Sequence, residues 1–183
     1  MKKINRLNKG VFTLLFAALL LPYGLKAQDD TQQKIINGSV SAKAALLKGD
    51  PSMQNLFTNS YGYAIFPSIG KGGLGVGGAA GKGAVYEQGS TVGTAQMVQV
   101  TIGFQAGGQA YREVIFFQNK EALDRFKENK VEFSAQTSAV AVKTGASANA
   151  NYRDGVVVFT QSKKGLMLEA SLGGQKFTYK PLK

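Results

Sequence analysis

The chain has 183 residues, 22 of them Lys or Arg and 11 Asp or Glu, and it contains no His, Cys or Trp. The absence of Cys excludes disulfides, zinc–thiolate sites and a cysteine nucleophile. The absence of His excludes a serine–histidine–acid triad. Carboxylate-based hydrolysis stays open, but no paired acidic motif stands out. We therefore expect one domain with a real core that is not an enzyme and that needs no cofactor or metal.

Residues 1–27 have the order of a secretory signal peptide, with a basic segment at 1–9 and an apolar run at 11–21. Leu25-Lys26-Ala27 offers a cleavage site, which would make Gln28 the first mature residue. The apolar run is short for a membrane span, and no Cys follows it, so a lipoprotein is excluded. We expect an exported, periplasmic or envelope-associated protein, with an uncleaved anchor as the alternative.

The charge of the mature chain is mildly basic. Loss of residues 1–27 removes five basic residues and no acidic one, which leaves 17 basic against 11 acidic residues, a formal charge of +6. Such a charge is compatible with binding to anionic lipid or another polyanion, and equally with solubility alone. Nucleic acid is not an expected partner.

Residues 28–60 are expected to form a helical segment. Apolar residues recur at helical spacing over 29–48, where a first helix is predicted. A second, short helix is predicted over 51–58, with Asp50 as its cap. The favoured interpretation is that both helices cover a sheet, and the alternative is that the first helix lies on a membrane. The apolar positions are Ile35, Ile36, Val40, Ala44 and Leu47 in the first helix and Met53, Leu56 and Phe57 in the second.

Residues 61–87 contain eight glycines between positions 70 and 83. Glycine is costly in a regular strand, so a tract this dense indicates a geometric need. With the period of a strand, five glycines share one face, which another backbone, a helix or a ligand can approach closely. The spacing also fits G-x-G-x-x-G, but no helix start follows, so a dinucleotide site is not expected. The shared face consists of Gly73, Gly75, Gly77, Gly81 and Gly83.

The rest of the β-rich core, residues 61–183, contains about eight strands in all. One strand is predicted over 98–106, and a helix over 120–128 is capped by Asn119, with Leu123 and Phe126 buried. A small-residue stretch at 133–150 could pack against the glycine face. The fold class is therefore α+β: a glycine-rich antiparallel β-barrel or sandwich with N-terminal helices and one inserted helix. In the strand predicted from residue 98 onward, the residues expected to face the core are Val98, Val100, Ile102, Phe104 and Ala106, and those expected to face outward are Gln99, Thr101, Gln105 and Gln109. The further strands are predicted at 114–117, 156–159, 166–172 and 176–179.

Four segments resemble the SYLF lipid-binding domain in one order and spacing, over about residues 40–180. They lie at 64–87 (AIFPSIGKGGLGVGG…), 102–126 (IGFQAGGQAYREVIFF…), 133–150 (FSAQTSAVAVKTGASANA) and 162–174 (SKKGLMLEASLGG). Members of this family include eukaryotic proteins that bind phosphoinositides and, in yeast, actin, and exported bacterial members form a separate branch. The chain departs from the family pattern at 142–145 and 93–96, which leaves the fold expected but the ligand preference open.

The resemblance implies lipid or membrane-surface binding, and in an exported protein this means anionic phospholipid of the cell envelope. The candidate contacts are Lys34 and Lys43 on the first helix and Lys71 and Lys82 beside the glycine tract. None of these lysines corresponds to an established family site. One alternative is a protein-interaction or scaffold module with an envelope partner, as the actin-binding relatives imply. A small outer-membrane barrel is a weaker alternative.

Overall fold

The computed structural model describes residues 21–103, 109–131, 133, 138–163 and 170–182. Contacts divide the chain into two compact units, residues 1–34 and 35–183, and the helix α1 contributes to both. Most of the signal peptide predicted at 1–27 lies outside the described residues. Within the described ranges, no helix combines the length and apolar character needed to cross a membrane.

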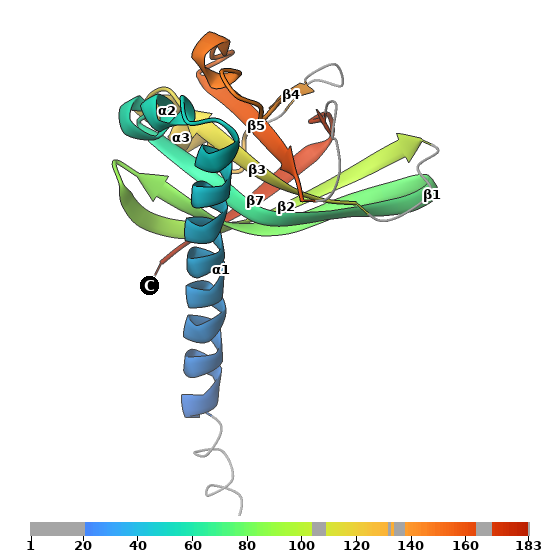
Figure 1. The fold of residues 1–183 in the computed structure, drawn as a ribbon. Helices are drawn as coiled ribbons and strands as arrows, with labels where there is room; N and C mark the ends of the chain where they lie inside the picture. Colours follow the sequence, from blue (N-terminus) through green and yellow to red (C-terminus); the bar gives the residue numbers. More distant parts are fainter. Residues whose placement is uncertain (1–20, 104–108, 132, 134–137, 164–169, 183) are drawn as a thin grey trace, which may run out of the picture. The chain divides into compact units, whose positions relative to one another are not determined.

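The described strands form one open sheet (Figure 1) in the order β6-β4-β5-β3-β1-β2-β7. All neighbours are antiparallel except β4 and β5. The α+β prediction is confirmed, but the described strands do not close into a barrel. The helices are α1 (Leu21–Gly49), α2 (Met53–Asn59), α3 (Lys120–Lys127) and the 3-10 helix η1 (Ser147–Asn149). The strands are β1 (Gly62–Glu87), β2 (Ser90–Gly103), β3 (Gln109–Phe117), β4 (Ser138–Ala141), β5 (Val156–Ser162), β6 (Ala170–Ser171) and β7 (Gln175–Pro181).

Strand β1 has two arms that pair with different neighbours. Its first arm, residues 62–71, pairs with β3, and its second arm, residues 75–87, pairs with β2. The arms lie against each other, since a Cβ placed on Gly62 would lie 2.6 Å from the carbonyl oxygen of Tyr86. The glycine tract therefore lies where this long strand returns along itself.

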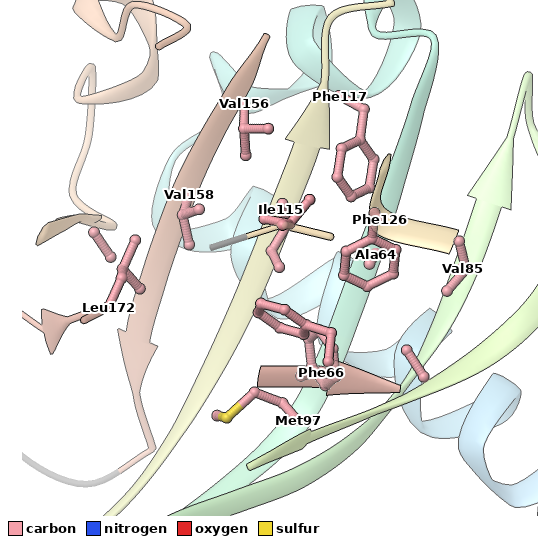
Figure 2. Close-up of a cluster of buried hydrophobic side chains, with 14 of the residues drawn as sticks. Ala64, Phe66, Val85, Met97, Ile115, Phe117, Phe126, Val156, Val158 and Leu172 are labelled. Atoms are coloured by element: carbon pink, nitrogen blue, oxygen red, sulfur yellow. The ribbon is translucent and has the colours of Figure 1, made fainter. Parts of the chain in front are cut away.

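Two apolar cores lie on the two faces of the sheet. On the face that α3 covers, Phe126 packs its ring 5.0 Å from that of Phe117, among side chains from β1, β2, β3 and β5 (Figure 2). On the opposite face, α1 and α2 bury Leu46 and Phe57 against strand residues that include Phe116. Each face of the sheet thus has its own helical cover.

The inserted helix is confirmed as α3, and the side chain of Asn119 accepts a hydrogen bond from the Ala122 amide at 2.9 Å. Leu123 and Phe126 are fully buried, as predicted. The chain is already helical at Leu21, the first described residue, so α1 extends further toward the N-terminus than the expected start at residue 29.

Asp50 lies at the corner between α1 and α2 and is buried. The N-cap residue of α2 is Ser52 and not Asp50 as predicted, and no side-chain hydrogen bond caps this helix. The Asp50 carboxylate instead accepts from the amides of Ser52 at 3.1 Å, Gly145 at 3.0 Å and Ser147 at 2.8 Å. Burial by itself raises the pKa of Asp50, but hydrogen bonds from Ser52, Ser147 and Gly145 outweigh it and lower the pKa to about 2. The ionised carboxylate therefore ties the helical corner to the loop around η1.

Candidate functional site

Strand β2 faces the opposite way from the sequence prediction. Val98 and Val100 are 43% and 72% exposed, whereas Gln99 is only 4% exposed. The prediction that the valines face the core is wrong, because the buried Met97 fixes the alternation of the strand. Gln99 tolerates burial since its amide nitrogen donates to the Gly173 carbonyl at 2.8 Å. Residues 104–108, where the same prediction continues, lie outside the described residues.

The two exposed valines belong to a surface that crosses three strands. Val98 pairs with Ala80 of β1 on one side and with Lys176 of β7 on the other. Side chains directly opposite each other in a sheet have Cβ atoms about 5 Å apart, so these residues form one continuous row. We call this surface the open face, and it consists of the exposed residues Gly78, Ala80, Lys82, Gln96, Val98, Val100, Lys176 and Thr178.

The open face is the uncovered continuation of the surface that α1 and α2 bury. Two residues beyond Lys82 on the same face, Ala84 is fully buried. The hydroxyl of Ser39, on α1, donates to the Ile65 carbonyl at 3.0 Å and accepts from the Ala84 amide at 3.2 Å. These bonds satisfy two buried backbone groups between the arms of β1, and they fix the place where the helical cover meets the sheet.

The charge of the open face is positive and unbalanced. No acidic residue occurs in β2, in β7 or in β1 before Glu87. Glu87 is engaged elsewhere, because it pairs with Lys127 at 2.6 Å and accepts from the Tyr61 hydroxyl at 3.0 Å. The bond from Lys127 lowers the pKa of Glu87, so this acid is fixed as a carboxylate at the end of β1. Within the described ranges, no ion pair involves Lys82 or Lys176.

Of the four predicted lysines, only Lys82 lies on the open face. Lys71 is two residues from Ile69 and opposite Gln109, which places it on the α3 side of the sheet. Lys34 is exposed on α1 and belongs to the N-terminal unit, residues 1–34. The structure therefore does not bring Lys71 and Lys82 together on one face.

Lys43 already contacts the protein itself. Its ammonium nitrogen lies 4.5 Å from the ring centroid of Phe57 and 5.1 Å from that of Tyr63. It also donates to the Tyr63 hydroxyl at 3.3 Å. A cation held over two aromatic rings stabilises the packing of α1 on the sheet, and its use in lipid binding stays a prediction.

Of the predicted glycine face, Gly81 and Gly83 are approached by backbone and not by a ligand. A Cβ on Gly81 would lie 2.8 Å from the carbonyl oxygen of Ser68, and one on Gly83 would overlap that of Ile65. Both neighbours belong to the first arm of β1. The small-residue stretch at 133–150 instead contributes β4, which pairs with β5 and β6. The roles predicted for Gly73, Gly75 and Gly77 stay predictions.

Sequence reasoning missed the exposed valines and Lys176 as site residues. For Lys176 the sequence did carry a signal, because Lys176-Phe177-Thr178-Tyr179-Lys180 in β7 alternates polar and aromatic residues. This alternation predicts a half-buried strand with lysines on its outer face. The observed burial has the same alternation, since Phe177 is buried while Lys176 and Thr178 are exposed.

Comparison with known proteins shows what this segment is similar to. Residues 98–181 match the Ysc84 family, whose description is Las17-binding protein actin regulator. The chain is also 28% identical over 167 residues to Beta cell expansion factor A of Aeromonas veronii. That alignment covers 84% of this chain and 64% of the relative, so the chain spans less than two thirds of the relative's length. The resemblance to the SYLF domain is thus confirmed over residues 98–181, the segment that is similar to the Ysc84 family.

Proposed function

We propose that the protein binds anionic phospholipid surfaces through the open face. The observation that supports this most strongly is the pair of exposed valines within a positively charged surface that carries no acidic residue. Lipid headgroups offer negative charge, and the acyl boundary beneath them accepts apolar side chains. A surface with both properties on one rigid sheet complements both layers of the membrane interface.

The expected binding is weak and reversible. Each lysine close to an anionic membrane contributes about 1 kcal/mol, and burial of a valine side chain contributes about 1.5 kcal/mol at most for these partly exposed positions. Lys82, Lys176 and the neighbouring Lys180 together with the two valines thus contribute about 5 kcal/mol before ordering costs. This total corresponds to binding in the millimolar range, so several molecules or several anionic lipids must act together.

A vesicle-binding series tests the proposal. We expect the protein to sediment with vesicles of phosphatidylcholine and phosphatidylglycerol at low salt, and to be released as salt rises. The double variant Lys82→Glu with Lys176→Glu should bind at least tenfold more weakly, because each reversal replaces attraction by repulsion. The matched control is Lys143→Glu with Lys163→Glu, which makes the same charge change at exposed lysines outside the open face.

The outcome that contradicts the proposal is equal vesicle binding by both double variants, or no binding by the unchanged protein. We further propose that this binding occurs after export, in the cell envelope, and that it is not coupled to catalysis. N-terminal mass analysis of the mature protein tests export, since an intact Met1 would contradict cleavage after Ala27.

A second candidate function is recognition of a protein partner. The description of the Ysc84 family names a protein, Las17, as the binding partner of its members. The same open face would then dock an acidic protein surface. Capture of one defined envelope protein in the absence of lipid, weakened by the Lys82→Glu and Lys176→Glu changes, would favour this function over lipid binding.

A further inference from the structure

A cluster of polar side chains is buried in the core on the α3 side of the sheet, which is the side opposite to the open face. Glu113 of β3 is fully buried, and Thr160 of β5 and Gln175 of β7 are 1% and 2% exposed. Thr160 is the direct cross-strand partner of Glu113. Gln175 comes from the opposite end of the sheet and donates its amide nitrogen to Glu113 Oε2 at 3.0 Å. This bond joins central strand β3 to strand β7 across the interior.

The hydrogen bonding of this cluster is incomplete. Glu113 Oε1, Thr160 Oγ1 and Gln175 Oε1 are buried and have no hydrogen-bond partner within the described ranges. Gln175 also interacts with the phenol of Tyr111, which is buried beside the cluster. An ionised carboxylate in this place would share its negative charge over two oxygens with one described hydrogen bond between them, which is costly in an apolar interior.

The groups that face Glu113 supply no compensating charge. Its cross-strand neighbour in β1 is Phe66, and in β5 it is Thr160. Tyr111 on its own strand is titratable, but burial and the nearby Glu113 both raise the pKa of its phenol, so it stays neutral. No Lys or Arg within the described ranges bonds to the cluster. Burial therefore raises the pKa of Glu113 to about 7, although the bond from Gln175 acts in the opposite direction.

We propose that Glu113 is a pH-sensitive latch: in its protonated form it keeps the interior between β3 and β7 closed, and on ionisation the cost of burying its charge, which exceeds the gain from the Gln175 bond, loosens β7 from the interior. A buried carboxylate draws in water once it is charged. Strand β7 is the element that yields, because it lies at one end of the strand order and, among the described strands, pairs only with β2. The opening begins at Gln175, the first residue of β7.

The direction of the pH effect follows from proton binding. The folded state keeps its proton to about pH 7, while the unfolded chain loses it near the ordinary pKa of 4.5. The folded state thus binds more protons between these two values, so stability is full below pH 4.5 and falls as the pH rises toward 7. The equilibrium constant for unfolding should rise by between one and two orders of magnitude from pH 5 to pH 7.5.

Denaturant unfolding of the unchanged chain and of Glu113→Gln, from pH 5 to pH 7.5, tests the latch. The glutamine copies the shape of the protonated acid, so this variant should lack most of the pH slope and should be the more stable protein at pH 7.5. Glu87→Gln is the control, because Glu87 pairs with Lys127 and its loss should leave the slope in place. Equal pH slopes in the unchanged chain and Glu113→Gln would overturn the proposal.

Two measurements on the unchanged chain keep the test decisive if Glu113→Gln does not fold. Carbon NMR of the glutamate carboxyls should show one that titrates near pH 7, and only carboxyls titrating below pH 5 would contradict the proposal. Hydrogen exchange, corrected for its intrinsic pH dependence, should show β7 amides losing protection with rising pH before those of β3. Parallel loss in β3 and β7 would show that no local latch exists.

Discussion

One face of the sheet is divided into two regions that share strands but differ in cover. Where α1 and α2 pack on it, small and aromatic residues such as Ala84 and Tyr86 are buried. Where the helices do not reach, the same strands expose Val98, Val100 and Lys82. The difference teaches that strand alternation sets which residues share a face, whereas helical cover sets whether that face becomes core or surface.

The largest effect is expected from filling the close contact between the arms of β1. In Gly83→Val the new Cβ overlaps the Ile65 carbonyl oxygen and lies 2.9 Å from the Phe66 ring. Backbone cannot move aside as a flexible side chain can, so we expect a loss of at least about 3 kcal/mol in unfolding free energy. Gly70→Val is the matched control, because nothing lies within 4 Å of its Cβ position. Equal, small losses in denaturant melts would contradict the observed contact.

A smaller loss is expected where α1 meets the sheet. Ser39→Ala leaves the Ile65 carbonyl and the Ala84 amide buried without their hydroxyl partner. Each unsatisfied buried group costs about 1–3 kcal/mol, and relaxation of the helix recovers part of it, so we expect about 2 kcal/mol. Ser41→Ala, on an exposed turn of the same helix, should change stability by less than about 0.5 kcal/mol. Comparable losses of unfolding free energy in Ser39→Ala and Ser41→Ala would mean that the two hydrogen bonds of the Ser39 hydroxyl do not stabilise the fold.

Acid should weaken the corner that holds the helical cover. The folded-state pKa of Asp50 is about 2, below its ordinary 3.8, so its contribution is present above pH 4 and is lost as the pH falls toward 2. We expect this loss to be about 1–2 kcal/mol, since the shift is partly offset by relaxation. Asp50→Asn should remove that part of the acid dependence in melts between pH 2 and pH 5. An unchanged acid profile in Asp50→Asn would contradict the assigned hydrogen bonds.

The smallest effect on stability is expected at Lys43. Lys43→Met keeps the aliphatic stem over Phe57 and Tyr63 but removes the ammonium, and such cation–π contacts contribute about 0.5–1 kcal/mol. Vesicle binding should be unchanged, because Lys43 belongs to the covered region. A loss of binding as large as that of Lys82→Glu would move the lipid contact to α1.

Much of the fold could be predicted from the sequence, because it follows from local signals. The cap at Asn119, the helical spacing of Leu123 and Phe126, and the alternation in β7 all act within a few residues. The inversion of β2 could not be predicted in this way. Val98 and Gln99 alternate equally well in either sense, and the choice depends on Met97 packing into the distant α3-side core and on the bond from Gln99 to Gly173.

The candidate site depended even more on distant contacts. The sequence alone does not distinguish Lys43 from Lys82 as a lipid contact. In the structure, the ammonium of Lys43 lies over two aromatic rings, whereas Lys82 is exposed. Lys176 joins Val98 only through the pairing of β7 with β2, across 78 residues of chain. Neither spacing nor composition carries that information.

The most direct test of the open face uses the absence of tryptophan from the chain. In Val100→Trp, the single indole lies on the open face, and in Gln54→Trp it lies on the exposed surface of α2. With vesicles containing phosphatidylglycerol, we expect the tryptophan fluorescence of Val100→Trp to shift to the blue and to be quenched by lipids brominated near the headgroup. The fluorescence of Gln54→Trp should show neither change. An unshifted, unquenched Val100→Trp on vesicles that still bind the protein would contradict the open face as the membrane contact.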